Sequence, residues 1–174
     1  MTDLDYAIRP AGPADAASMR DIHLAAFPTA AEADLVERIE RDGDSVLSFV
    51  AEHGGRPAGH ILLSRMRVSG DGRDCRALGL GPVAVQPSLQ RGGIGSALIR
   101  AALAAAAEAG KELVFVVGDP AYYRRFGFAA ATAEPFEPPY AGPYLMALAL
   151  SDMRPPERGR ADYPPAFAAL EGPQ

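Results

Sequence analysis

The sequence predicts a mixed α/β (α+β) fold around one hydrophobic core, and three observations support this prediction. Segments 45–52 and 57–68 have strand patterning and are joined by His53-Gly54-Gly55-Arg56, which is a hairpin signal. A glycine-rich turn and an alanine-rich helical segment, 94–109, separate two apolar strand-like segments, which is the pattern of a βαβ unit. The length of 174 residues, with 48% hydrophobic residues, favours one domain over two.

The first part of the chain predicts one short strand and two helices. Residues 6–9 alternate in polarity and are stopped by Pro10, as in a short strand. The first helix is expected to have Pro13 in its first turn. The segment Thr29-Ala30-Ala31-Glu32 fits a capping box, in which a hydroxyl and a carboxylate satisfy free backbone donors. A second helix should therefore start here and end near Gly43.

The second half of the chain predicts three further strands and a short helix. In the strand expected over 77–85, Gly81-Pro82 indicates a bulge or an unpaired edge, because proline cannot donate to a strand ladder. The apolar segment 113–117 has the length and composition of a strand that is covered on both faces. A short helix over 120–126 and a strand near 144–150 complete the pattern.

Composition excludes several classes of function. The net charge of -5 disfavours a surface that follows nucleic-acid phosphates, so we expect no nucleic-acid partner. The single cysteine, Cys75, excludes an internal disulfide, and the histidines lack metal-ligand spacing, so no metal is expected. Acidic residues near Met1 and the lack of a long apolar segment predict a cytoplasmic protein without a membrane partner. We expect one domain over residues 1–150, with a Pro-rich, irregular tail, 151–174, packed on it.

The turn Gln90-Arg91-Gly92-Gly93-Ile94-Gly95 enters the longest predicted helix and is suited to binding a phosphate. A helix N-terminus offers unpartnered N–H groups and a partial positive charge, and glycines let the backbone approach closely. Arg91 and Ser96 add a charge and a hydroxyl. An isolated turn of this kind is more often purely structural, but the helix entry and the preceding strand favour an anion site. A Walker loop is excluded because Ser96, not lysine, follows the last glycine, and the dinucleotide pattern G-x-G-x-x-G is absent.

At this point the residues resemble a known family. Segment 90–95 matches the Q/R-x-x-G-x-G/A acyl-CoA signature of the GNAT acetyltransferase superfamily, and segment 80–87 looks like the fourth strand of that family. Tyr123-Arg124-Arg125-Phe126-Gly127-Phe128 matches its Y-x-x-x-G-F segment. With the preceding Gly118-Asp119-Pro120-Ala121-Tyr122, this ending is similar to the YhbS-like bacterial branch. Motif-grade similarity covers residues 80–128.

The resemblance implies a mostly antiparallel central sheet with flanking helices and a splayed central strand pair. It also implies that acetyl-CoA is the co-substrate, with its pantetheine arm along the bulged strand and its pyrophosphate on the glycine loop. Asp119 either contacts the pantetheine or caps the short helix. The predicted binding residues are Val83, Ala84, Val85, Gln90, Arg91, Gly92, Gly93, Ile94, Gly95, Ser96 and Asp119.

The implied reaction is direct attack of a primary amine on the acetyl thioester in a ternary complex. By family position Tyr123 is the general acid, and the neighbouring Tyr122 is its competitor, since adjacent rings on a helix point about 100° apart. A free alkyl amine has a pKa of about 10 and must lose a proton before it attacks. The candidates for this base are His60, Glu52, Glu137 and a water relay.

Two matters stay open from the sequence. The acceptor is a small-molecule or peptide amine whose identity carries no readable code, and homodimers are common in the family although no pattern in this chain supports one. A non-catalytic module that binds or senses acyl-CoA is the alternative function, because it would keep the glycine loop and need no tyrosine acid.

Overall fold

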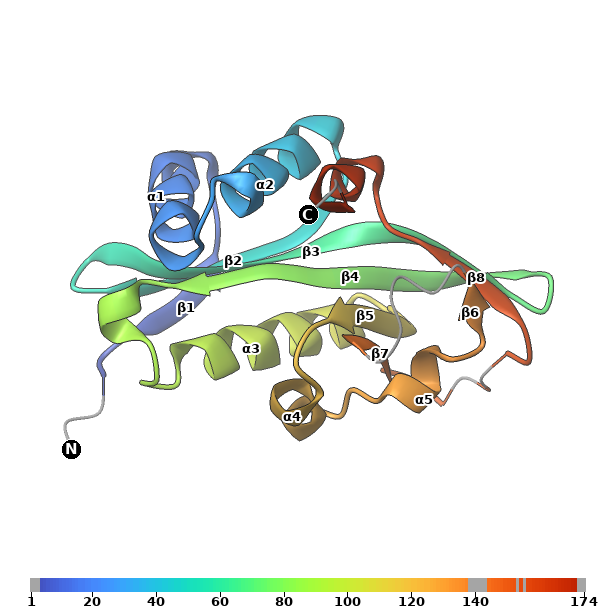
Figure 1. Ribbon diagram of the computed structural model, residues 1–174. Coiled ribbons are helices and arrows are strands. Elements are labelled where there is room, and N and C mark those ends of the chain that lie inside the picture. Colours follow the sequence, from blue (N-terminus) through green and yellow to red (C-terminus); the bar gives the residue numbers. More distant parts are fainter. Residues whose placement is uncertain (1–3, 138–143, 153, 155, 172–174) are drawn as a thin grey trace.

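The computed structural model describes residues 4–137, 144–152, 154 and 156–171. Over these residues, a mostly antiparallel sheet of eight strands separates two layers of helices (Figure 1). The strands are β1 (Ala7–Pro10), β2 (Ser45–His53), β3 (Arg56–Gly70), β4 (Arg73–Val85), β5 (Leu113–Val117), β6 (Phe136–Glu137), β7 (Leu145–Ala149) and β8 (Gly159–Asp162). The predicted mixed α/β fold is confirmed.

The order of the strands places β4 at the centre of the sheet. Strands β1 to β4 are successive antiparallel neighbours, β5 lies parallel to β4, and β7 lies antiparallel to β5. The predicted hairpin of β2 and β3 turns at Gly54 and Gly55, whose φ angles of 59° and 77° favour glycine. The parallel pairing of β4 with β5 confirms the predicted βαβ unit.

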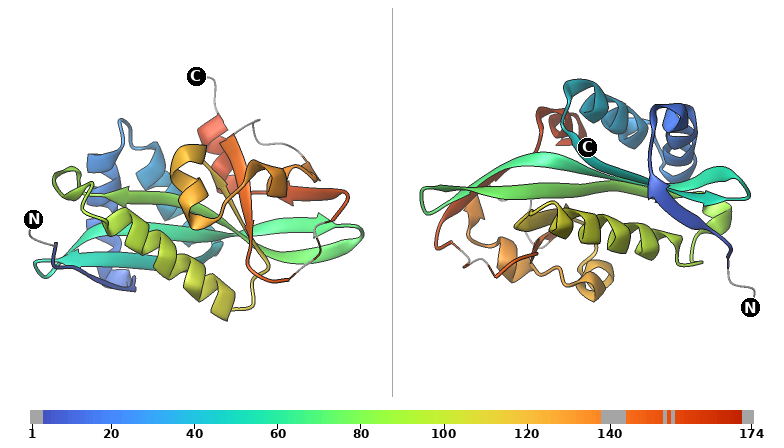
Figure 2. Two further views of the ribbon diagram at one scale, coloured as in Figure 1. Left: turned by 90° about the horizontal axis from the view of Figure 1, so that it is seen from below. Right: turned by 180° about the vertical axis from the view of Figure 1, so that it is seen from behind.

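Helices cover both faces of the sheet (Figures 1 and 2). On one face lie α1 (Ala16–Ala26) and α2 (Ala31–Asp42), and on the other lie α3 (Ile94–Glu108), α4 (Pro120–Tyr123) and α5 (Ala130–Ala133). The short 3-10 helices are Pro13–Asp15, Pro87–Leu89, Arg124–Phe126 and Pro165–Glu171. Within the described ranges, none of the helices is long and apolar enough to cross a membrane.

The start of α2 differs from the prediction. Ala30 is the N-cap, and the Thr29 hydroxyl accepts a hydrogen bond from the Ala31 amide at 3.3 Å without forming a capping box. The predicted box was wrong because it needs the carboxylate three residues after the N-cap, whereas Glu32 is only two residues after Ala30. The end of the helix agrees with the prediction, since Gly43 has a left-handed φ of 78°.

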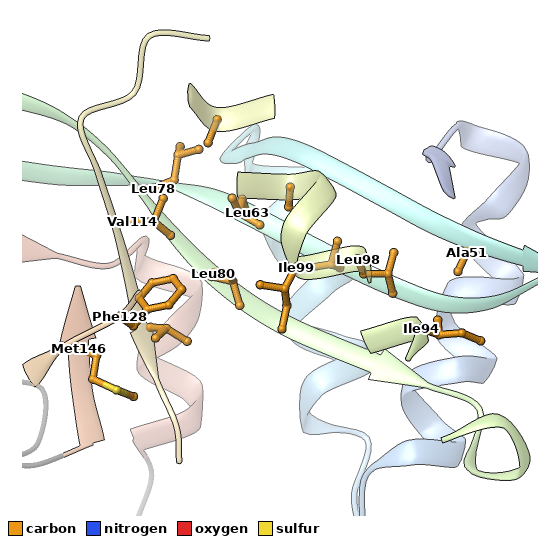
Figure 3. Close-up of a cluster of buried hydrophobic side chains, with 14 of the residues drawn as sticks. Ala51, Leu63, Leu78, Leu80, Ile94, Leu98, Ile99, Val114, Phe128 and Met146 are labelled. Atoms are coloured by element: carbon orange, nitrogen blue, oxygen red, sulfur yellow. The ribbon is translucent and has the colours of Figure 1, made fainter. Parts of the chain in front are cut away.

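A hydrophobic cluster between the sheet and α3 holds that helix in place (Figure 3). Ile94, Leu98 and Ile99 of α3 are at most 1% exposed, and they belong to the same cluster as Leu78 and Leu80 of β4. Burying one such side chain contributes roughly 1.5–3 kcal/mol. The start of α3 is therefore fixed relative to β4.

A bulge interrupts the pairing of β4 with β3. Leu80 pairs with Leu63 and Val83 pairs with Ile61, so the two residues Gly81-Pro82 lie opposite one residue of β3. This confirms the predicted irregularity at Gly81-Pro82, because two residues opposite one is the defining count of a bulge.

Past the bulge, β4 separates from β5. The two strands pair only from Ala77 to Gly79 on β4, opposite Leu113 to Phe115 on β5. From Leu80 to Val85, the only pairing of β4 in the described chain is therefore with β3, and the edge that faces β5 is unpaired. The predicted splayed strand pair is confirmed.

The C-terminal segment is more regular than predicted. Strand β8 pairs antiparallel with the far end of β3, from Arg67 to Gly70, and parallel with β6. The expectation of a wholly irregular tail was wrong for residues 159–162, because this short strand extends the sheet.

Candidate active site

A cleft of about 580 Å³ lies along the unpaired part of β4 and the start of α3. All of the predicted binding residues line it except Gly92 and Asp119. Among the residues that the structure describes, the lining consists of Ala26, Phe27, Val83, Ala84, Val85, Leu89, Gln90, Arg91, Gly93, Ile94, Gly95, Ser96, Tyr122 and Arg125. The structure therefore brings a free strand edge and a helix N-terminus into one cleft.

The loop between β4 and α3 is held in a conformation that opens the helix end. Arg91 and Gly93 have positive φ angles of 68° and 90°, and Gly93 is the N-cap of α3. Glycine has no side chain with which to cap the first turn, so Gly93 itself provides no acceptor for the amides of that turn. The side-chain amide of Gln90 donates to the carbonyl of Val85 at 3.1 Å and ties the loop to β4.

The two predicted binding residues outside the cleft have structural contacts. A Cβ at Gly92 would collide with the Leu4 side chain, so a larger residue here would force that side chain to shift. Asp119 is the N-cap of α4, and its Oδ1 accepts a hydrogen bond from the Ala121 amide at 2.9 Å. Of the two roles expected for Asp119, the structure shows the helix cap.

The two tyrosines of α4 occupy different environments. Tyr122 lines the cleft, and a Cβ built on Gly95 would lie 3.4 Å from its hydroxyl oxygen. Tyr123 is outside the cleft lining and packs edge-on against Phe128, with ring centroids 5.9 Å apart. A Cβ at Gly118 would lie 2.5 Å from the ring of Tyr123, so only glycine leaves room for this ring. Burial raises the pKa of the Tyr123 phenol to about 12.

His60 is enclosed in the protein interior beneath α1. It is 0% exposed, its Nδ1 lies 2.8 Å from Nε2 of His23, and its Nε2 lies 2.8 Å from the Ser48 hydroxyl. Burial lowers the pKa of His60 to about 3 and that of His23 to about 4. Both ring nitrogens of His60 are engaged, which leaves neither free to take a proton from a substrate.

The two carboxylates proposed as bases lie apart from the cleft lining. Glu52 accepts a hydrogen bond from Arg9 at 3.0 Å, and Arg9 also pairs with Asp15 at 2.8 Å. Glu137 is an exposed residue of β6, a strand that pairs with β8. Neither carboxylate is brought to the cleft by the described part of the fold.

Some residues of the cleft were not predicted from the sequence. Ala26 and Phe27 come from the end of α1, which lies far from the glycine loop in sequence. Arg125 comes from the 3-10 helix that follows α4, and it lines the cleft together with Tyr122. Arg125 follows Tyr122 by three residues on a helical segment, and residues at this spacing lie on the same face of a helix. This spacing is the sequence signal that could have identified Arg125.

Comparisons with known proteins point to one family. A family model described as an acetyltransferase (GNAT) domain matches residues 7–131. The chain is 35% identical over 132 residues to the uncharacterized N-acetyltransferase YjhQ of Escherichia coli K12, which covers 74% of this chain and 73% of that protein.

Two solved structures are similar over nearly the whole chain. The GNAT family N-acetyltransferase YhbS from Escherichia coli, in complex with CoA, has a TM-score of 0.86 and 28% identity, covering 97% of this chain and 94% of its own. A GNAT family acetyltransferase from Brucella melitensis, in complex with acetyl-CoA, has a TM-score of 0.77 and 35% identity, covering 94% of this chain and 98% of its own.

Proposed function

Because this chain belongs to the GNAT acetyltransferase family, we propose that it transfers an acetyl group from acetyl-CoA to a primary amine. One observation carries the proposal: a single cleft joins the unpaired edge of β4, from Val83 to Val85, to the uncapped N-terminus of α3. The free strand edge suits the amides of a pantetheine arm, and the helix end suits a diphosphate. The relatives solved with CoA and with acetyl-CoA support the same donor.

The proposed reaction is a direct attack of the amine within a ternary complex. The attack converts the thioester carbonyl to an oxyanion, which a backbone N–H near Val83 or Val85 would stabilise. The carbon–sulfur bond then breaks and CoA leaves as a thiolate, whose conjugate thiol has a pKa of about 8.5. Proton donation to this thiolate is helpful rather than obligatory.

Tyr123 is the proposed proton donor. Its pKa of about 12 keeps the phenol protonated throughout the neutral range, and on this proposal the phenol donates a hydrogen bond to the leaving sulfur. For the base, His60 and Glu52 are engaged by other residues, and Glu137 is exposed outside the cleft lining, so we favour the water relay. We propose that the acceptor is a small-molecule or peptide amine met in the cytoplasm; a homodimer stays a prediction.

A non-catalytic acyl-CoA-binding module is the second candidate function. It is favoured by one observation, namely that Tyr123 packs against Gly118 and Phe128 and is outside the cleft lining. Such a module would bind CoA and leave the thioester intact.

Binding and turnover measurements separate these functions. We expect CoA to be retained through purification, as seen by mass spectrometry, and acetyl-CoA to release free thiol when an amine from a screening panel is added. Tyr123→Phe should lower kcat by about a hundredfold with little change in the Kd of CoA. Tyr122→Phe is the matched control variant. The proton donor is the tyrosine whose hydroxyl, when removed, lowers kcat. CoA binding with no thiol release from any amine of the panel would favour the module.

A further inference from the structure

We infer that Arg125, held in place by the ring of Tyr122, binds the diphosphate of CoA from the α4 side of the cleft. This inference rests on the proposed function, because it assumes that CoA is the occupant. Both residues line the cleft that also contains Gly93, Gly95 and Ser96 of the glycine loop and α3. The diphosphate would then lie between backbone amides on one side and a guanidinium group on the other.

The guanidinium of Arg125 is positioned by an aromatic stack. Its Cζ lies 4.9 Å from the centroid of the Tyr122 ring, within the range of a cation–π contact. The Tyr122 ring meets the Phe126 ring with centroids 5.4 Å apart, and Phe126 lies under Arg100 of α3, whose Cζ is 5.1 Å from its centroid. The stack therefore connects the segment after α4 to α3, the helix whose start forms the anion site.

Tyr122 sets the distance between Arg125 and the loop. Its hydroxyl lies against Gly95, where an added Cβ would be 3.4 Å from the oxygen. Since Arg125 covers the face of the same ring, Tyr122 lies next to both the guanidinium group and the first turn of α3. On this inference, the phosphate is bound between the two.

The charge of Arg125 is uncompensated within the described part of the chain. Arg9, Arg20 and Arg73 each pair with a carboxylate at 3.0 Å or less, whereas no ion pair of Arg125 occurs among the described residues. The cleft lining contains Arg91 in addition to Arg125, and none of its described residues is an aspartate or glutamate. A protein with a net charge of -5 thus presents a local positive site, which is what a dianionic ligand requires.

Arginine suits this position better than lysine. A planar guanidinium can lie flat on an aromatic ring and still donate two parallel hydrogen bonds to phosphate oxygens, while an ammonium group is a point charge without that fixed geometry. The inference makes Tyr122 a positioning residue and leaves the role of proton donor to Tyr123.

Isothermal titration calorimetry with three probes tests the inference. CoA and 3′-dephospho-CoA both contain the diphosphate, and pantetheine lacks it. Arg125→Gln is expected to weaken CoA and 3′-dephospho-CoA by a similar factor of about ten, as for the loss of one charge-assisted hydrogen bond, and to leave pantetheine unchanged. The difference between wild type and Arg125→Gln should shrink at high salt, because an exposed charge is screened.

Matched variants separate positioning from fold effects. Arg124→Gln removes the same charge from the exposed neighbour outside the cleft lining and should leave the Kd of CoA within about twofold. Tyr122→Leu removes the ring under Arg125 and should weaken CoA about as much as Arg125→Gln, whereas Tyr122→Phe keeps the ring and should restore the affinity. Urea unfolding of each variant shows whether the fold is retained.

The outcomes distinguish this inference from the proposed function. Wild-type protein that binds neither CoA nor 3′-dephospho-CoA would overturn both. Tight binding by wild type and equal binding by Arg125→Gln would overturn only the role of Arg125. If Arg125→Gln lowers the affinity for CoA but not for 3′-dephospho-CoA, Arg125 contacts the 3′-phosphate. That result would overturn the assignment to the diphosphate.

Discussion

Acidification from pH 7 to pH 5 is expected to destabilise the fold through the buried pair His23 and His60. Both side chains are 0% exposed and lie 2.8 Å apart, nitrogen to nitrogen. Burial lowers the pKa of His23 from 6.5 to about 4 and the pKa of His60 from 6.5 to about 3. Two charged imidazoles cannot occupy this site without a large desolvation and repulsion penalty.

The sign and size of the effect follow from proton linkage. Below pH 6.5 the unfolded chain binds protons at both histidines, whereas the folded chain stays neutral there until the pH approaches 4, so acidification lowers the free energy of unfolding. At pH 5 the loss is about 2 kcal/mol for each histidine, or about 4 kcal/mol for both. Asp15 does not contribute to the change between pH 7 and pH 5. Its pKa is lowered to about 2, so the stability that it contributes is lost only below pH 4.

Urea unfolding at pH 7 and pH 5 measures this loss directly. His60→Gln removes one titrating group and keeps a side chain that can hydrogen-bond to Ser48, so we expect the loss between the two pH values to fall by about half. His23→Gln should have a similar effect. A wild-type free energy of unfolding that is unchanged between pH 7 and pH 5 would refute the assignment of both histidines as neutral buried groups.

Three glycine and capping positions give further predictions. Gly93→Ala should cost about 1 kcal/mol in urea unfolding, because φ is 90° there, and should weaken CoA binding by calorimetry; unchanged values of both would contradict the role of the loop. Gly79→Ala should cost about 1–3 kcal/mol, since its Cβ would lie 2.8 Å from the Tyr163 ring, and an unchanged melting temperature would show that the ring moves freely. Asp119→Ala should cost about 1 kcal/mol through loss of the α4 cap, with stability restored in Asp119→Ser. A Kd of CoA that rises in the serine variant would instead support the pantetheine contact.

The sequence was sufficient to predict the parts of the fold that have local causes. The bulge follows from Gly81-Pro82, and α3 follows from a glycine turn and an alanine-rich segment. Strand β8 could not be predicted in this way, because four residues carry little periodicity and their pairing partner, β3, is distant in sequence. The start of α2 was missed by one position, since the capping pattern does not say which of Thr29 and Ala30 is the N-cap.

For the candidate site too, residues from one local segment could be predicted, and residues brought in by tertiary packing could not. The residues from Gln90 to Ser96 are contiguous, so one segment of sequence was enough to predict a glycine turn at a helix N-terminus, which the structure places along the cleft. Phe27 and Arg125 reach the cleft through the packing of α1 and α4, which sequence patterns do not specify. His60 appeared as a lone strand histidine, because its partner His23 is 37 residues away on another element.

The separation of β4 from β5 also bears on how the reaction would be regulated. On the proposed function, the unpaired edge from Val83 to Val85 and the glycine loop hold the parts of the donor that acetyl-CoA and CoA have in common. The spent product would then compete for the same backbone contacts as the fresh donor. Turnover would follow the ratio of acetylated to free coenzyme in the cell rather than the concentration of acetyl-CoA alone, which makes the protein responsive to the supply of acetyl groups.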